Sequence, residues 1–302
     1  MLSKKTVVFL ALAYALAWMI GFGFFALGGR VDSGAFVAMA IPYMFAPAAA
    51  AVITQKLIWK EPLRDLGLQV PRLPWLLIAV LLPVFLVVAA LALSLALPGV
   101  SLVTGLDALT GALARKLPAQ QITDLHSQLE QTFLAKPGVL LLVSFMQVLI
   151  AGPSINAVAG LGEELGWRGL LLRELESLGF WRSSLVIGFF WGLWHLPLIA
   201  AGYNYPGHSV AGPIVMIVLT ILLSPLSGYV RLRAQSVFAA AVFHGTFNAA
   251  ATLVIFTKGG TAFTVGVTGV AGLITLLLAD AALWLYLQRH SADGGDATTQ
   301  LP

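Results

Sequence analysis

Long apolar segments alternate with short polar ones along most of this chain. Eight of them are long enough, at about 18 residues or more, to be interpreted as membrane-spanning helices. They are Thr6–Gly28, Ala35–Gln55, Pro74–Pro98, Gly138–Gly160, Ser183–Ala201, Pro213–Val230, Val237–Thr257 and Ala262–Leu287. The first follows two lysines, as the core of a signal peptide would, but its length predicts a retained helix. The pattern predicts an all-α fold, a polytopic transmembrane helix bundle of about eight spans.

Two of the polar segments are long enough to hold helices of their own. In residues 99–137, Leu125, Leu129 and Phe133 recur every four positions among polar neighbours, which predicts an amphipathic helix on the membrane surface. Residues 161–182 predict a further helix, ended by Gly179.

Three regions are expected along the chain. Residues 1–137 hold N-terminal transmembrane helices and the amphipathic loop, 138–257 form the region with candidate chemistry, and 258–302 hold the last helix and a tail. The tail from Ser291 is small and polar, which predicts disorder.

Composition supports a membrane protein. Hydrophobic residues make up 59% of the chain and charged residues 10%, whereas soluble domains carry roughly 25% charged residues. The net charge of +4 comes from residues in the loops, so it is interpreted as a topology signal rather than a nucleic-acid-binding surface. Cysteine is absent, which excludes disulfides, thiolate metal sites and cysteine catalysis.

The lysines and arginines predict the orientation of the bundle. With the N-terminus inside, the predicted inner segments hold Lys4, Lys5, Lys56, Lys60, Arg64, Arg72, Arg168, Arg173, Arg182, Arg231, Arg233 and Arg289, and the outer ones Arg30, Arg115, Lys116, Lys136 and Lys258. This excess of positive charge inside predicts that both termini are cytoplasmic. Short loops and Ala- and Leu-rich spans favour a bacterial plasma membrane.

A small set of polar groups lies in or beside the predicted spans. Such groups cost several kcal/mol each at membrane depth, which makes them candidates for function. They fall in three places, each at helical spacing: Glu163, Glu164, Arg168, His195, His244 and Asn248.

The first place contains the two glutamates and the arginine. Arg168 lies four residues after Glu164, so these two share a helix face and can pair, whereas Glu163 points about 100° away. The alternative is that both acids stabilise a helix N-terminus at the interface.

The second and third places are centred on histidines. His195 follows Trp191 by one turn and precedes Pro197, which should kink or end the helix; an interfacial aromatic belt with a hydrogen-bonded histidine is the alternative. His244 and Asn248 lie four residues apart among small residues, so an interhelical hydrogen-bonding pair is the alternative there.

Together these groups suit the hydrolysis of an amide bond inside a membrane. A carboxylate and an imidazole can hold and deprotonate a water, while a second histidine and an asparagine can donate to a developing oxyanion. Histidine and glutamate are also zinc ligands, so Glu163, His195 and His244 are the residues that would hold a divalent metal if one is present. No cofactor is otherwise expected.

The residues resemble the motifs of a known family. Glu163-Glu164-x-x-x-Arg168, Trp191-x-x-x-His195 and His244-x-x-x-Asn248, in this order, resemble the EExxxR, FxxxH and HxxxN motifs of the CPBP family. This family comprises the type II CAAX prenyl endopeptidases and related bacterial Abi-type proteins. The resemblance covers about residues 138–255, and Trp191 departs from the usual phenylalanine.

The resemblance implies an intramembrane endopeptidase. It implies that Glu163 is the general base that activates water with help from His195, and that His244 and Asn248 form the oxyanion hole. Glu164 and Arg168 would be an orienting pair. The implied partners are the lipid bilayer and a peptide or protein substrate, lipidated or not. A non-catalytic regulator or immunity-type protein and, with less support, a proton-coupled transporter are the alternatives.

One further acid interrupts the last predicted span. Asp280 lies about two turns from its cytoplasmic end. We interpret it as a salt-bridge partner of a loop arginine or as a carboxyl kept protonated by burial, rather than as a second polar relay. Beyond it, Trp284, Tyr286 and Arg289 resemble an interfacial anchor.

Overall fold

The computed structural model describes the whole chain except residues 1, 114–118, 133–134, 137 and 293–302. The α-helices are α1 Lys4–Ala26, α2 Gly34–Val52, α3 Leu73–Leu95, α4 Leu106–Leu113, α5 Ala119–Glu130, α6 Val139–Ala151, α7 Ala157–Glu164, α8 Leu172–Glu174, α9 Phe180–Trp194, α10 Leu196–Ala200, α11 Ala211–Ala234, α12 Val237–Ala251 and α13 Val270–Ala292. π-Helical turns span Ile53–Ile58, Gly152–Asn156 and Leu165–Leu171, and 3₁₀ turns span Leu63–Leu66, Glu176–Leu178 and Thr252–Phe256. The predicted all-α fold is confirmed.

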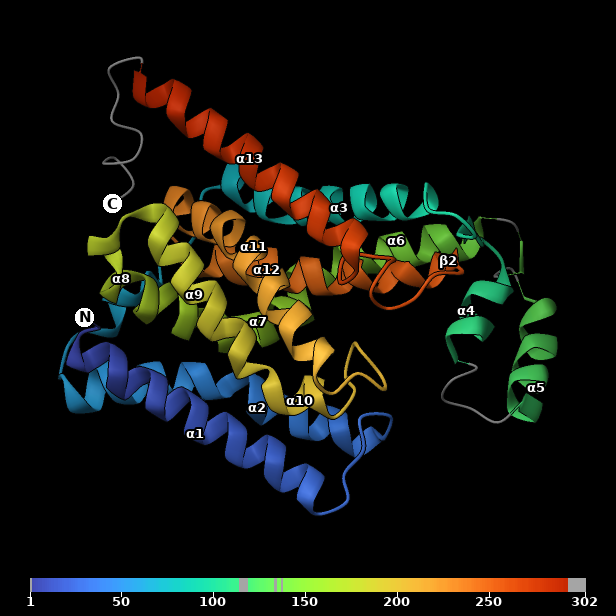
Figure 1. Ribbon diagram of the computed structural model, residues 1–302, viewed down its shortest axis with the longest axis horizontal. Helices are drawn as coiled ribbons and strands as arrows, with labels where there is room; N and C mark the ends of the chain where they lie inside the picture. The colour runs from blue at the N-terminus through green and yellow to red at the C-terminus, as the bar shows by residue number, and fades with distance from the viewer. Residues whose placement is uncertain (1, 114–118, 133–134, 137, 293–302) are drawn as a thin grey trace.

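The helices form one bundle around α12 (Figure 1). α12 packs against α3, α7 and α11, and almost every one of its residues is buried. α1 and α2 lie on one side of it and α3 and α13 on the other (Figure 1). The N-terminus, α8 and the C-terminal end of α13 lie at the same end of the bundle, called here the N-terminal end.

Seven helical segments of the described chain are long and apolar enough to cross a membrane. They correspond to seven of the eight predicted spans. The remaining predicted span, Ser183–Ala201, is interrupted at His195: α9 ends at Trp194 and α10 starts at Leu196. The break lies next to Pro197, as expected of a residue that lacks a backbone N–H donor.

Two other predicted elements differ from the structure. The predicted span over 138–160 and the separate helix over 161–182 are one apolar helical segment, Val139–Glu174, interrupted only by two π turns. The expected end of this region at Gly179 is confirmed, where φ is +75°. π turns widen a helix without ending it and occur often at functional sites.

The long polar segment contains two short helices, α4 and α5, rather than one. They pack on each other and project from the end of the bundle opposite the N-terminus (Figure 1). Leu125 and Leu129 are half-buried on α5, and Phe133 lies outside the described residues. Location on a membrane surface stays a prediction. A two-residue antiparallel pairing, β1 Ser101–Leu102 with β2 Thr257–Lys258, joins the start of this segment to the chain after α12.

Asp280 lies buried on α13. Its side chain makes no ion pair with any described residue, and Oδ1 has no hydrogen-bond partner in this part of the chain. The predicted salt bridge from Asp280 to a loop arginine is therefore not formed within the described part of the chain. The alternative of a carboxyl kept protonated by burial stays a prediction.

Glycines set the close packing of α9 on α11. A Cβ at Gly188 would lie 2.6 Å from Ile221 Cα, and one at Gly192 would lie 2.6 Å from Ile217 Cα. Both contacts are with backbone, which cannot rotate away. The spacing of four residues places both glycines on one helix face, the arrangement that lets membrane helices approach closely.

Replacing Gly188 with Ala is expected to destabilise the bundle by about 1–3 kcal/mol, the usual cost of overpacking. Gly23→Ala is the matched control, because a Cβ on Gly23 of α1 meets no described atom within 4 Å and alanine favours a helix. Thermal unfolding in detergent measures both variants. Equal midpoints for the two would contradict the close packing.

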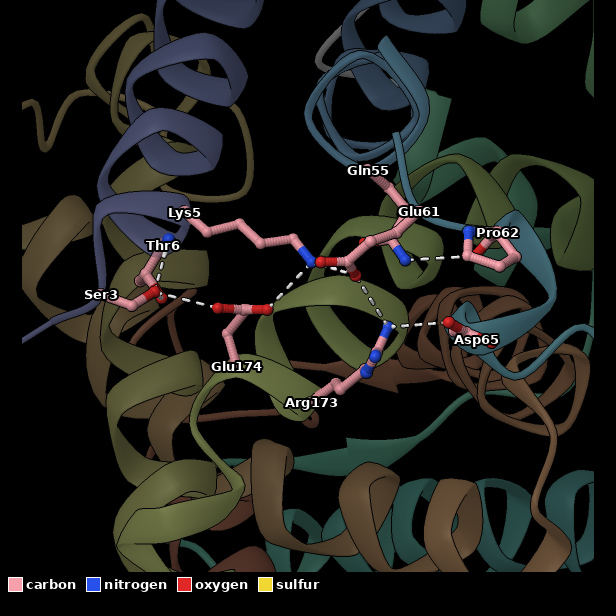
Figure 2. Close-up of polar contacts among 9 residues, drawn as sticks. All are labelled: Ser3, Lys5, Thr6, Gln55, Glu61, Pro62, Asp65, Arg173 and Glu174. Atoms are coloured by element: carbon pink, nitrogen blue, oxygen red, sulfur yellow. Dashed lines mark hydrogen bonds and ion pairs between the residues drawn. The ribbon is translucent and has the colours of Figure 1, made fainter. Parts of the chain in front are cut away.

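Ion pairs tie three segments together at the N-terminal end (Figure 2). The buried ammonium of Lys5 on α1 lies 2.7 Å from Glu61 and 3.2 Å from Glu174 at the end of α8. Arg173 lies 3.4 Å from both Glu61 and Asp65. The cluster therefore joins the first helix to the loop after α2 and to the helix that carries the two candidate glutamates.

Stability should depend on pH through Glu61. The hydrogen bond from Lys5 lowers the pKa of the Glu61 carboxyl, so its stabilisation is present above the unfolded value of about 4.3 and is lost as pH falls through the lower folded value. Glu61→Gln should therefore lower the unfolding midpoint at pH 7, and the difference from wild type should shrink below about pH 4. A difference that persists unchanged at pH 3 would contradict this assignment.

Candidate active site

The candidate site is buried among α7, the π turn after it, α9 and α12. Glu163, Glu164, Arg168 and His244 are each at most 4% exposed. The helical segment that carries the glutamates continues from Val139 to Glu174 through two π turns, so both acids lie far from its N-terminus. The alternative that these acids stabilise a helix N-terminus is therefore wrong.

Small residues bring α7 and α12 together. A Cβ on Gly160 would lie 3.0 Å from the carbonyl of Ala241, and one on Gly245 would lie 2.5 Å from the carbonyl carbon of Asn156 and against the amide of Ala157. The small residues around His244 thus let α7 approach α12 closely. This approach places His244 within reach of the glutamates.

Glu164 is the centre of a buried ionic cluster. Its Oε1 accepts from Arg168 Nη1 at 3.0 Å and from His244 Nδ1 at 2.9 Å. The predicted pairing of Glu164 with Arg168 on one helix face is confirmed. Oε2 of Glu164 and Nε and Nη2 of Arg168 have no partner among the described residues. Glu164 is thus held by two donors on one oxygen, which suits an orienting role.

Glu163 is held separately, by the side chain that departs from the family pattern. The indole Nε1 of Trp191 donates to Glu163 Oε2 at 2.7 Å. A phenylalanine has no such donor. The bond engages one carboxylate oxygen and fixes the plane of the carboxyl group, so Oε1 is available to a water.

Trp191 contacts the other groups as well. Arg168 stacks over its ring, with the guanidinium carbon 4.4 Å from the ring centroid. The rings of His244 and His195 lie 5.3 and 5.9 Å from it, centroid to centroid. Trp191 therefore packs against Arg168 and both histidines while it also donates to Glu163.

The tautomer of His195 follows from its hydrogen bond. Nδ1 lies 2.8 Å from the carbonyl oxygen of Trp191, which can only accept, so Nδ1 carries the proton. In the neutral ring Nε2 is then an acceptor. Unlike the glutamates, His195 is only half-buried.

The backbone beside His195 is held from outside α9. The carbonyl of Trp194 accepts from Tyr43 Oη at 2.6 Å and from Trp18 Nε1 at 3.1 Å. Sequence reasoning missed both donors. The available signal was Pro197, because a helix broken by proline leaves carbonyls that need partners from other helices.

Asn248 is placed differently from the rest. It lies one turn after His244 on α12, as predicted, but its side chain is exposed and makes no hydrogen bond with the described residues. The structure brings together Glu163, Glu164, Arg168, His195 and His244 around Trp191, and leaves Asn248 on the accessible side of α12.

The residues suggested for a metal do not form a metal site. Among the described residues, no three His, Asp or Glu side chains lie close enough together to hold an ion. Glu163, His195 and His244 therefore do not fit the donor set that zinc requires.

Comparison with known proteins identifies this region. The family model described as type II CAAX prenyl endopeptidase Rce1-like matches residues 143–250. We call residues 143–250 the Rce1-like domain after this match. The resemblance to the CPBP family stated from the three motifs is confirmed, and every residue of those motifs lies within the matched segment.

A curated relative matches part of the same chain. CAAX prenyl protease 2 of Methanococcus maripaludis is 30% identical over 131 residues, which is 41% of this chain and 45% of that protein. The chain thus spans about half the length of the relative it matches. The apolar helices and the Rce1-like domain together indicate an integral multi-pass membrane protein.

Proposed function

We propose that this protein is an intramembrane endopeptidase that hydrolyses a peptide bond with a water activated by Glu163. The observation that carries the proposal is the separation of two adjacent glutamates into two environments. Glu164 is tied to Arg168 and His244, whereas Glu163 accepts one hydrogen bond, from Trp191, and only on Oε2. Such a pair divides naturally into one structural and one reactive carboxylate.

In the first step, Glu163 takes a proton from water while the oxygen attacks the carbonyl carbon of the substrate. Nε2 of His195, an acceptor in the tautomer fixed by Trp191, helps to hold the water. Negative charge develops on the carbonyl oxygen. The exposed amide of Asn248 donates to it, and His244 donates from Nε2 when both of its ring nitrogens carry protons.

In the second step, the carbon–nitrogen bond breaks. The proton held by Glu163 passes to the leaving amine, which restores the carboxylate. The products are a carboxylic acid and an amine, as hydrolysis requires. Glu164 and Arg168 touch no reacting atom in this scheme; they hold His244.

The family and the relative's name both point to a protease, which implies a peptide or protein substrate that reaches the membrane. The test is a comparison of protein termini in membranes from cells that express wild type or Glu163→Gln. Termini that appear with wild type alone would support proteolysis and identify the substrate. The mass of the new fragments would show whether the substrate is lipidated.

Identical termini, with both proteins folded and at equal abundance, would overturn the proposal. The non-catalytic regulator would then be the better explanation. A phenotype restored equally by wild type and Glu163→Gln would lead to the same conclusion.

Trp191 should contribute to the rate through its bond to Glu163. Trp191→Phe keeps a ring for Arg168 and His244 but removes the donor, which costs about 1.5–3 kcal/mol for a bond to a charged group. We expect kcat to fall roughly tenfold or more, with KM little changed. Trp181→Phe, at a half-buried position near the start of α9, is the matched control. An unchanged kcat would contradict the role of the indole.

A further inference from the structure

A cavity opens at the N-terminal end of the bundle, and of the residues clustered around Trp191 it shares only Arg168. Its volume is about 610 Å³, within the range of small-ligand sites. It is bordered by the loop between α2 and α3, the chain through Arg168 to Gly179, the start of α9 and the end of α11. We call it the basic cavity because of its lining.

Positive charge dominates the lining. Five arginines border the cavity, and two acids accompany them: Arg64, Arg72, Arg168, Arg173 and Arg231, with Asp65 and Glu176. Asp65 is already shared by Arg64 and Arg173. The side chain of Arg72 has no ion-pair or hydrogen-bond partner among the described residues, although its backbone carbonyl accepts from Trp75 and Leu76. Arg168 is paired with Glu164 and Arg173 also with Glu61, so Arg72 and Arg231 are the lining arginines without a carboxylate partner among the described residues.

Arg231 is held in place without a carboxylate. Its Nε donates to the carbonyl of Arg168 at 3.1 Å, and Nη2 donates to the carbonyl of Leu66 at 3.4 Å. Gly67, at φ +82°, makes room for it, since any Cβ there would collide with the guanidinium. Two neutral acceptors and a glycine thus fix a cation at the cavity wall, leaving its charge uncompensated.

The aromatic residues around the cavity favour a position at the depth of lipid head groups. Half-buried aromatic residues occur near the same helix ends, with Trp75 near the start of α3, Trp181 near the start of α9 and Tyr229 near the end of α11. Tryptophan and tyrosine mark the membrane–water interface. Basic pockets between helices at this depth suit phosphorylated head groups.

We propose that the basic cavity binds an anionic phosphate group, with Arg231 and Arg72 as its main donors. Guanidinium groups match phosphate geometry and form strong charge-assisted bonds. The phosphate belongs to an anionic phospholipid or to a soluble phosphate. Because Arg231 also holds the carbonyl of Arg168, an occupant is linked to the segment that carries the ionic cluster, and its binding stabilises the folded domain.

The experiment is native mass spectrometry of the full-length protein in detergent, titrated with phosphatidylglycerol, phosphatidylcholine or inorganic phosphate. Arg231→Gln and Arg72→Gln remove donors from the cavity wall. Arg72 is exposed and unpaired, so its variant should fold even if that of Arg231 does not. Arg289→Gln is the control, because Arg289 lies on α13 at the same end of the bundle and does not border the cavity.

Phosphatidylglycerol should bind more tightly than phosphatidylcholine, and each cavity variant should weaken it about tenfold while Arg289→Gln leaves it unchanged. Inorganic phosphate binding with the same arginine dependence, without phosphatidylglycerol binding, would support the phosphate site and assign it to a soluble ligand. The proposal would be overturned if neither phosphatidylglycerol nor inorganic phosphate bound. It would also be overturned if Arg289→Gln weakened binding as much as the cavity variants do. Proteolysis does not enter this readout, so the outcome is independent of the proposed activity.

Discussion

Glu163→Gln is expected to lower the rate of peptide-bond hydrolysis by about 10²–10⁴-fold, the usual contribution of a positioned general base. Glutamine has nearly the shape of glutamate, and its amide oxygen can still accept from Trp191 Nε1, which donates to Glu163 at 2.7 Å. The change therefore removes the base and leaves the packing. The measurement is the initial rate of the purified proteins on a substrate found by the comparison of termini.

The matched control is Glu130→Gln, an exposed acid on α5 outside the Rce1-like domain. It should keep the wild-type rate. Retention of more than half of the wild-type rate by Glu163→Gln would show that another group activates the water. Equal thermal unfolding of wild type and Glu163→Gln must accompany the result, so that a low rate is not mistaken for a loss of folded protein.

Arg168→Met is expected to destabilise the folded protein by about 3–5 kcal/mol, because it leaves Glu164 as an uncompensated buried charge. Glu164 and Arg168 have fully buried side chains 3.0 Å apart. His244 would remain as the sole donor to the carboxylate. Unfolding in detergent, followed by tryptophan fluorescence, measures the loss.

The single variants Glu164→Gln and Arg168→Met and the double variant that combines them form a double-mutant cycle. Neutral glutamine still accepts from His244 and leaves no buried charge, so the double variant should regain most of the lost stability. A double variant whose loss equals the sum of the two single losses would show that the ion pair contributes no coupling. That result would contradict the central position of Glu164 in the site.

Much of the fold followed from local pattern. Seven of the eight predicted spans correspond to long apolar helices. The membrane core demands about 20 apolar residues, and its lack of water forces the backbone N–H and C=O groups to hydrogen-bond within the helix. The pairing of Glu164 with Arg168 was equally local, since a spacing of four residues fixes both on one face. The break near His195 also followed from local sequence, because Pro197 lacks a backbone N–H donor.

The local sequence pattern gave a wrong boundary in Val139–Glu174, where the helix continues through π turns. Gly152–Asn156 and Leu165–Leu171 are π turns, which widen the helix and leave no clear mark in composition. The predicted boundary between two separate elements at about Gly160 is therefore wrong. Gly160 instead serves close packing against α12.

By itself, the sequence determined a membrane bundle, its candidate polar residues and their pairings within single helices. These features depend on hydrophobicity and on spacings of three or four residues, both of which can be read directly from the sequence. Only the tertiary structure decided that Trp191 holds Glu163, that His244 reaches Glu164 across 80 positions, and that Asn248 stays exposed. Contacts between helices depend on rotation and depth, which are set by how glycines and large side chains interlock across the whole bundle.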